Sequence, residues 1–381
     1  MIAAIRPGLI CNFHPTPFMG KTLGVPIIPK TMRAVIYRGA NDLRVETVPV
    51  PRIRSDELLV KVVACGVCPT DIKKIQYGTV RPPRIFGHET SGTISQVGAR
   101  LKGFRIGERV GLHHHVPCLD CHACRHRAFA QCAQYKRTGV TAGFEPAGGG
   151  YAEYVRVMAF TLPGVVKIPA RNSFLEGAML EPVNTVLKAI NRLSLLAGDV
   201  VLVIGQGPVG LMFTRLLALR GVNVVASDLL TARLKLAKRF GAKVVLRPDE
   251  KSFSETAMRM TRKRGFDAVI VTVPSDAAVH QAQQLARGAG QVLLFAHTRR
   301  GVSTELDLSA VCVEEKDLIG SYSSDFTLQN KAAELVFGRS LDVRGLITHQ
   351  FPLEQTDDAI QLAARPASGS LKIFVVQDAG R

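Results

Sequence analysis

The stretch Val200-Val201-Leu202-Val203-Ile204-Gly205-Gln206-Gly207-Pro208-Val209-Gly210 decides the fold. Its first five residues are apolar and predict a buried strand, and a helix is expected to begin directly after the spaced glycines. In such a strand–turn–helix unit, Gly205 permits the tight turn, Gly207 lets a ligand approach the backbone, and Gly210 allows close helix-to-strand packing. The helix N-terminus then faces an anion. The stretch therefore predicts a diphosphate site made by Gly205, Gly207, Pro208, Val209 and Gly210.

A carboxylate closes the next predicted strand at the distance expected for a dinucleotide site. Asp228 follows the strand at 222–227, where a carboxylate accepts hydrogen bonds from the adenosine ribose and repels a 2′-phosphate. NAD is therefore favoured over NADP. Arg233 is a candidate ribose contact, and its positive charge keeps NADP open as the second choice.

Strands and helices alternate through the region from 183 to 320. Helices are expected at 185–195, 208–219, 231–240, 253–261 and 277–285, and strands at 200–204, 222–227, 244–246, 268–271 and 291–295. This alternation is typical of right-handed βαβ crossovers. We expect a doubly wound parallel sheet at 183–320.

The region from 32 to 182 has a different texture. Short β-rich runs recur at 33–37, 43–48, 57–64, 93–97, 109–111, 151–157 and 165–168, and they predict a β-barrel-like domain. The tail at 321–381, with a helix near 328–337 and a strand at 371–376, is expected to pack back on that domain. Residues 1–31 contain five prolines and no acidic residue, so we expect a loose extension or a translation start upstream of Met32.

Four of the chain's eight cysteines fall in one short window. Cys118, Cys121, Cys124 and Cys132 follow the pattern C-x2-C-x2-C-x7-C, and paired C-x-x-C turns present thiolates at tetrahedral zinc geometry. A disulfide cluster is the alternative, but the chain shows no secretory signal. The spacing predicts a structural zinc site.

Three further metal-binding side chains are dispersed along the chain. Cys68, His88 and Glu181 supply one thiolate, one imidazole and one carboxylate. A set of three donors leaves a coordination position open, as a catalytic zinc requires. Each residue alone has a plain structural explanation, as a small core residue, a turn histidine or a carboxylate at a helix start.

The composition bears on partners and location. The net charge of +18 is compatible with nucleic-acid binding, but the basic residues are scattered, Trp is absent and aromatic residues make up 6%. A zinc-containing nucleic-acid-binding protein would also leave the glycine fingerprint unexplained, so no nucleic-acid partner is expected. No apolar run approaches the length of a transmembrane helix. We expect a cytoplasmic protein without a membrane partner.

From Met32 to the C-terminus the chain resembles the zinc-dependent medium-chain dehydrogenases, the alcohol, polyol and threonine dehydrogenase group. The segments that carry the resemblance are 66–71, the Gly87-His88-Glu89 signature, the four-cysteine window, Gly150-Tyr151-Ala152-Glu153-Tyr154 and the fingerprint at 205–210. The resemblance implies a GroES-like catalytic domain joined to a Rossmann cofactor domain, two zinc ions per chain, an alcohol substrate and a homodimer or homotetramer.

The resemblance also implies roles for single residues. Cys68, His88 and Glu181 would bind the catalytic zinc, with Glu89 as a nearby carboxylate able to approach it. Asp71 would orient His88, Thr70 would relay the substrate proton, and Thr185 would contact the nicotinamide. Cys65 is expected to be a core residue and not a metal ligand.

Some residues depart from the common family pattern. Pro69 removes a side-chain contact to the diphosphate, and Lys73 replaces a histidine that completes the proton relay in some relatives. The run His113-His114-His115 is interpreted as a polar pocket wall or exposed loop rather than a third metal site.

The third ligand bears on the expected substrate. A glutamate at this position is closer to the polyol and threonine dehydrogenases than to simple alcohol enzymes. We therefore expect oxidation of a polyol, cyclitol or amino alcohol, with His113, His114 and Tyr322 as candidate substrate contacts. A simple alcohol dehydrogenase using NAD or NADP and a non-catalytic relative are the alternatives.

Overall fold

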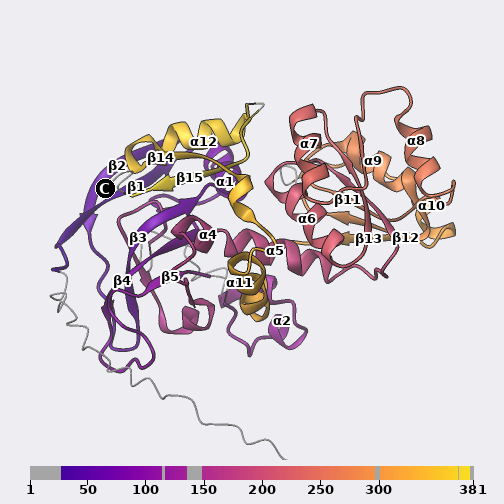
Figure 1. The fold of residues 1–381 in the computed structure, drawn as a ribbon. Helices are drawn as coiled ribbons and strands as arrows, with labels where there is room; N and C mark the ends of the chain where they lie inside the picture. The colour runs from indigo at the N-terminus through magenta and orange to yellow at the C-terminus, as the bar shows by residue number, and fades with distance from the viewer. Residues whose placement is uncertain (1–26, 114–115, 135–147, 297–300, 368, 378–381) are drawn as a thin grey trace, which may run out of the picture.

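The computed structural model describes residues 27–113, 116–134, 148–296, 301–367 and 369–377. Two large sheets form the two halves of the molecule, as Figure 1 shows. One sheet is parallel and the other is mostly antiparallel. A separate hairpin of β1 (Thr31–Gly39) and β2 (Asp42–Pro49) attaches to the antiparallel half through the hydrogen bond from Val35 N to Tyr151 O.

The parallel sheet has six strands in the order β10-β9-β8-β11-β12-β13. Its strands are β8 (Val200–Ile204), β9 (Asn223–Ser227), β10 (Val244–Leu246), β11 (Phe266–Val271), β12 (Ala286–Leu294) and β13 (Asp317–Gly320). The helices between them are α6 (Pro208–Leu219), α7 (Thr231–Arg239), α8 (Phe253–Met260), α9 (Asp276–Leu285) and α10 (Leu308–Val313). The strand order reverses between β8 and β11, which is where doubly wound sheets bind their ligands.

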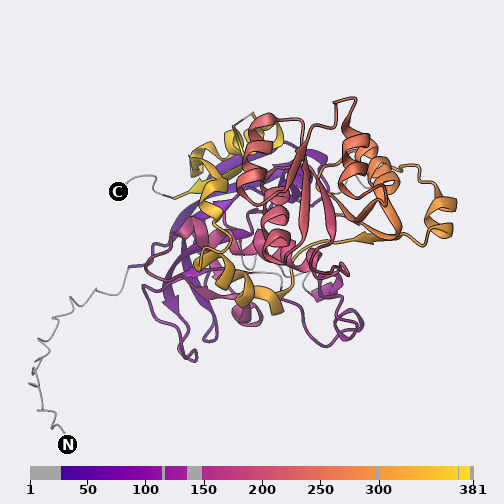
Figure 2. The same cartoon turned by 45° about the vertical axis from the view of Figure 1, so that its right-hand side comes forward.

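The other sheet runs β14-β15-β3-β4-β5-β7, with β6 also paired to β3. Its strands are β3 (Leu58–Gly66), β4 (Glu89–Val97), β5 (Arg109–Gly111), β6 (Tyr154–Val157), β7 (Val166–Lys167), β14 (Ile347–Pro352) and β15 (Lys372–Val376). The last two strands come from the C-terminal tail, and α12 (Thr356–Ala364) lies with them in both views (Figures 1 and 2). The tail therefore returns to the half built from the first part of the chain.

Two helices pack together between the sheets. They are α5 (Leu180–Ile190) and α11 (Gln329–Phe337), and both contribute to one apolar core that extends into the parallel sheet. The short helix α4 (Phe174–Ala178) precedes α5 and begins with a capping box between Ser173 and Glu176. Since α5 belongs to both halves, side chains along it lie where the halves meet.

The structure corrects the sequence predictions at two helices. We expected a helix at 185–195, but α5 begins at Leu180 and ends at Ile190. Pro182 suggested a break, yet proline is tolerated in the first turn of a helix, where its missing N–H costs nothing. The strand-rich half also contains α1 (Pro69–Tyr77), which the prediction missed although Pro69 starts it and Gly78, at φ 62°, ends it.

The strand predictions were largely confirmed, but the tail was incompletely predicted. The strands expected at 200–204, 244–246 and 109–111 have these bounds in the structure. In the tail, β14 and α12 were not predicted, and neither were α10 and β13, which precede it. The expectation for residues 1–31 falls mainly outside the described residues.

Candidate metal centres and cofactor site

The four cysteines of the predicted structural zinc site converge in the structure. The Sγ–Sγ distances are 3.5 Å for Cys121–Cys124, 3.6 Å for Cys118–Cys132 and 3.9 Å for Cys118–Cys124. A disulfide requires about 2.05 Å. Four sulfurs at about 2.3 Å from a tetrahedral zinc lie about 3.8 Å apart. The cluster therefore fits zinc and not a disulfide pair.

The local backbone positions the cysteines of this lobe and favours the thiolate form of one of them. Cys121 precedes the short helix α2 (His122–Arg125), and Cys132 follows the 3₁₀ turn Phe129–Gln131. Backbone N–H groups of Asp120 and Cys121 lower the pKa of Cys118 to about 6, which favours the thiolate. Phe129 packs edge-to-face on Phe326 at 5.4 Å, so the lobe also contacts the segment after β13.

A Cys132→Ser variant tests the structural role of this lobe. Cys132 is fully buried, and loss of one of four thiolates weakens zinc binding, whose free energy contributes to folding. We expect the zinc content to fall by one ion per chain and the Tm to drop by at least about 5 °C. Scanning calorimetry with metal analysis measures both. An unchanged Tm would contradict a structural role. The control is Cys312→Ser, which changes an exposed cysteine outside the lobe.

The second donor group lies between α1 and β4. Ligand atoms of Cys68, His88 and Glu89 all fall within 4.8 Å of one another, and both His88 and Glu89 are buried. Cys68 is placed by the start of α1, and Glu89 by the first position of β4. A partly buried thiol with a buried imidazole and a buried carboxylate forms a donor set that suits zinc.

A buried aspartate orients the histidine of this group. Asp71 Oδ2 lies 3.1 Å from His88 Nδ1, and Asp71 is fully buried. Burial tends to lower the pKa of His88, but the charges of Asp71 and Cys68 outweigh it and hold that pKa well above its usual value. With Nδ1 directed at Asp71, Nε2 is the nitrogen available to a metal. The pairing predicted for Asp71 is thus present in the structure.

Lys372 forms a buried ion pair with Glu89, and the sequence interpretation missed it. Its Nζ pairs with Glu89 Oε2 and donates to Val67 O at 2.9 Å. Burial opposes the charged form of Lys372, but Glu89 outweighs that effect and raises its pKa. A single lysine in the apolar run Leu371–Val376 was the available signal, because a buried lysine requires a buried partner.

Glu181 lies beside the group rather than within it. Its side chain is buried in the first turn of α5, and its carboxylate Oε1 lies 3.3 Å from Thr185 Oγ1. The charge of Glu181 acts on Glu89 and Lys372. Of the two glutamates, the structure brings Glu89 closest to Cys68 and His88, with Glu181 adjacent.

The predicted diphosphate site has the expected backbone geometry. Gly205 has φ 91°, and a Cβ on Gly210 would clash with Gly205 O. A Cβ on Gly207 would meet nothing closer than Arg233 Nη1 at 3.9 Å, so the backbone there faces open space next to the N-terminus of α6. This cradle fits a dinucleotide diphosphate.

Asp228 and Arg233 lie beside that cradle. Asp228 Oδ2 accepts from Gln206 N at 2.6 Å, and Oδ1 accepts from Leu230 N at 2.8 Å. Each carboxylate oxygen retains a second acceptor position for a ribose hydroxyl. Arg233 Nη1 lies 3.8 Å from Asp228 Oδ2. The two residues expected from the sequence to contact the ribose therefore lie next to the fingerprint, Asp228 directly after β9 and Arg233 on α7.

The remaining candidate residues have different positions. Thr70 lies in the first turn of α1, and Lys73, on the same helix, is partly buried. His113 is buried, with Nε2 3.5 Å from Ser324 Oγ. The charges of His88 and Cys68 act on the phenol of Tyr322, which places it near the dispersed donor group. His114 and His115 lie outside the described residues.

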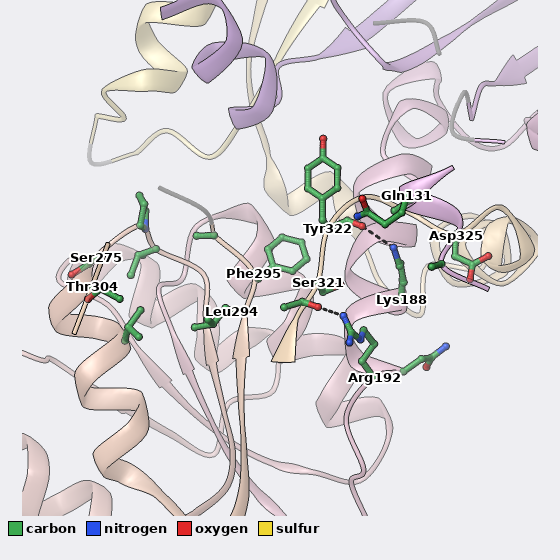
Figure 3. Close-up of a pocket in the computed structure, with 18 of the residues that line it drawn as sticks. Gln131, Lys188, Arg192, Ser275, Leu294, Phe295, Thr304, Ser321, Tyr322 and Asp325 are labelled. Atoms are coloured by element: carbon green, nitrogen blue, oxygen red, sulfur yellow. Dashed lines mark hydrogen bonds between the residues drawn. The ribbon is translucent and has the colours of Figure 1, made fainter. Parts of the chain in front are cut away.

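A pocket of about 1130 Å³ opens between α5, the cysteine lobe and the carboxyl ends of β11, β12 and β13. Figure 3 shows Leu294, Phe295, Ser275 and Thr304 on one side and Gln131, Lys188 and Arg192 on the other. Its volume exceeds the 300–1,000 Å³ typical of single-ligand sites. The pocket thus has room for part of a dinucleotide together with a small substrate.

A dinucleotide cradle and a thiol–imidazole–carboxylate group in one chain define a metal-dependent dehydrogenase. Comparison with known families agrees. Residues 54–170 match the alcohol dehydrogenase GroES-like domain, and residues 208–337 match the zinc-binding dehydrogenase family. These matches confirm the expected GroES-like and Rossmann folds.

Curated relatives cover nearly the whole chain. Sorbitol dehydrogenase of Bacillus subtilis is 29% identical over 354 residues, covering 91% of this chain and 98% of its own. A probable D-xylulose reductase A of Emericella nidulans is 27% identical over 342 residues, covering 86% and 91%. A zinc-binding dehydrogenase from Sinorhizobium meliloti, solved with NADP, superposes with a TM-score of 0.81 at 27% identity, covering 91% and 100%. The chain belongs to the zinc-dependent medium-chain alcohol and polyol dehydrogenase family.

Membership of this family fixes the general reaction. The protein is a zinc-dependent dehydrogenase that acts on CH–OH groups with NAD or NADP, and its zinc sites are a structural four-cysteine site and a catalytic Cys/His/Glu site. Among the described residues, no helix has the length and apolar character needed to cross a membrane.

Proposed function

We propose that the protein oxidises a secondary hydroxyl of a polyol, cyclitol or amino alcohol to the ketone, with NAD as the hydride acceptor and two zinc ions per chain. The observation that carries the proposal is the group of the partly buried Cys68 with the buried His88 and Glu89, with Glu181 adjacent, at the junction with the Rossmann sheet. A glutamate in place of a further cysteine, and relatives named for sorbitol and xylulose, support a polyol substrate.

The metal site is expected to use Cys68 Sγ, His88 Nε2 and the Glu181 carboxylate as ligands. When bound, zinc lowers the pKa of a coordinated alcohol and so makes the alkoxide accessible near neutral pH. Lys372 holds Glu89 through the buried ion pair and so keeps that carboxylate from competing with Glu181. Asp71 fixes the ring of His88.

The proton and the hydride of the substrate are expected to pass to different groups. The hydroxyl of Thr70 is proposed to accept the substrate proton and pass it outward along α1, with water completing the relay that Lys73 does not supply. Thr185 and the fingerprint glycines would hold NAD, whose nicotinamide would supply the hydride acceptor for the carbinol carbon. His113 and Tyr322 remain candidate contacts to other hydroxyls, as does His114.

Asp228 is expected to select NAD over NADP. An Asp228→Asn variant keeps the size of the side chain and removes the charge that repels a 2′-phosphate. We expect the ratio of kcat/KM for NAD to that for NADP to fall at least tenfold, measured by initial rates with one polyol. Asp342→Asn, which removes a carboxylate paired with Arg344 away from the fingerprint, should leave the ratio unchanged. An unchanged ratio in Asp228→Asn would contradict the assignment.

A substrate panel tests the proposed function. Polyols, cyclitols, amino alcohols and simple alcohols are supplied to the zinc-loaded protein with NAD and with NADP, and NADH or NADPH formation is followed. Highest kcat/KM on a polyol, cyclitol or amino alcohol with NAD supports the proposal. Highest kcat/KM on a simple alcohol would replace it with the alternative function. A homodimer or homotetramer and a cytoplasmic location stay predictions.

A further inference from the structure

Two basic residues stand at the end of α5 that is far from the donor group. Lys188 lies in the last turn of α5, and Arg192 lies in the turn that follows it. Both line the large pocket, and Figure 3 shows them next to each other with their heads directed at the segment 320–322. The same helix carries Thr185 about one turn and Glu181 about two turns before Lys188. One element therefore leads from the expected reaction centre to a pair of cations.

The charges of these two residues have no acidic partner at ion-pair distance within the described part of the chain. Lys188 Nζ donates to Tyr322 O at 2.7 Å, and Arg192 Nη1 donates to Gly320 O. Both acceptors are neutral backbone carbonyls, and each cation has donors left over. Burial lowers the pKa of Lys188, because keeping the charged ammonium group partly out of water is unfavourable.

The pocket lining carries more basic than acidic side chains. Its ionisable residues are four basic ones and two acidic ones, namely His126, Arg127, Lys188, Arg192, Asp276 and Asp325. Asp325 Oδ1 accepts from the backbone N–H and the hydroxyl of Thr327, at 2.9 and 2.7 Å. Its charge favours the charged form of Lys188 only from a distance. The net charge of the chain, +18, adds a field that attracts anions.

We propose that Lys188 and Arg192 bind an anionic group, a phosphate ester or a carboxylate, on the end of the substrate remote from the hydroxyl that is oxidised. This inference rests on the proposed function and narrows its substrate class to acidic polyols. An anion would provide the charged hydrogen-bond partner that both heads lack, and charge-assisted hydrogen bonds are the stronger ones.

The spacing of Glu181 and Lys188 along α5 indicates how long such a substrate would be. Lys188 follows Glu181 by seven residues, which corresponds to about 10 Å along the helix axis. An extended carbon chain advances about 1.25 Å per bond. Seven bonds, from the second carbon of a hexitol to a terminal oxygen of a phosphate on its sixth oxygen, span about 8.8 Å, and a hydrogen bond of about 2.8 Å extends the reach to about 11.6 Å, close to the spacing along the helix. A polyol of five or six carbons with a terminal anion therefore fits.

The test compares matched substrates. A neutral hexitol, the same hexitol with a terminal phosphate and the corresponding sugar acid are assayed with NAD and the zinc-loaded enzyme. We expect kcat/KM for at least one anionic form to exceed that of the neutral hexitol at least tenfold, and the two anionic forms distinguish phosphate from carboxylate. In Lys188→Gln and in Arg192→Gln this preference should fall at least tenfold. Equal kcat/KM for all three substrates in the unmodified enzyme would overturn the proposal.

A matched control variant distinguishes the effect of the two pocket residues from the effect of positive charge elsewhere on the protein. Arg215 also donates to a backbone carbonyl, from Nε to Ser340 O at 2.8 Å, but it lies outside the pocket. Arg215→Gln should keep the preference for the anionic substrate. If Arg215→Gln lowers the preference as much as Arg192→Gln, the overall charge is responsible and the proposed site is wrong.

A binding measurement keeps the inference testable without turnover. Inorganic phosphate is titrated into the zinc-loaded enzyme saturated with NADH, by calorimetry. Binding that weakens at least tenfold in Lys188→Gln and in Arg192→Gln is expected, and absence of binding, or equal affinity in both variants, would contradict the site. A protein that oxidises no alcohol yet binds phosphate through these residues would refute the proposed function while leaving the anion site intact.

Discussion

A Cys68→Ala variant is expected to lose one of two zinc ions per chain and to lose kcat/KM by at least about a thousandfold with any alcohol. Cys68 is the only thiol in the dispersed donor group, since the other described cysteines are the four of the lobe, the buried Cys65 and the exposed Cys312. Removing the thiolate leaves His88 and carboxylates, which hold zinc too weakly to retain it in a site with an open position. Metal analysis of the purified variant, together with initial rates, measures both effects.

Cys65 supplies a sharp control for that experiment. It precedes Cys68 by three residues, but it is fully buried, and burial raises its pKa to about 12, so its thiol stays protonated. Cys65→Ala should therefore keep two zinc ions. Retention of both ions in Cys68→Ala would contradict the assignment of Cys68, and loss of an ion in Cys65→Ala would move the ligand to the earlier cysteine.

A Gly207→Val variant is expected to weaken NADH binding at least a hundredfold while leaving the fold intact. The backbone of Gly207 has φ −68°, which valine adopts without strain, and a Cβ there would meet only Arg233 Nη1 at 3.9 Å. The added side chain therefore occupies the space where the diphosphate would approach the backbone. Fluorescence titration with NADH measures the affinity, and thermal unfolding measures the stability.

Gly39→Val is the matched control for this substitution. A Cβ on Gly39 meets nothing within 4 Å, and the residue ends β1, away from the fingerprint. NADH affinity should stay at the level of the unmodified enzyme in this variant. Tight NADH binding by Gly207→Val would show that the dinucleotide does not use the fingerprint backbone.

The parallel half of the fold was the more predictable one. Each of its strands except β13 has an apolar run bounded by turn residues, so periodicity alone located them. In the antiparallel half α1 was not predicted, although Pro69 begins this helix and Gly78 ends it. At α5, Pro182 was interpreted as a boundary although it lies in the first turn. Local signals near proline and glycine are ambiguous until packing selects one interpretation.

The candidate site was predictable where motifs are local and not where pairing is distant. Cys68, His88 and Asp71 belong to short signatures, and the structure brings them together. Lys372 reaches Glu89 only because β15 pairs with β3, which itself pairs with β4. No spacing rule links residues so far apart in sequence. The same holds for Lys188 and Arg192, whose carbonyl partners are Tyr322, just after β13, and Gly320, the last residue of β13.

An anomalous difference map recorded at the zinc absorption edge, from crystals of the purified protein, tests the central claim most directly. The account predicts two zinc peaks per chain, one enclosed by Cys118, Cys121, Cys124 and Cys132 and one bound by Cys68 and His88 with the Glu181 carboxylate. A single peak at the four-cysteine lobe, with none between Cys68 and His88, would contradict it.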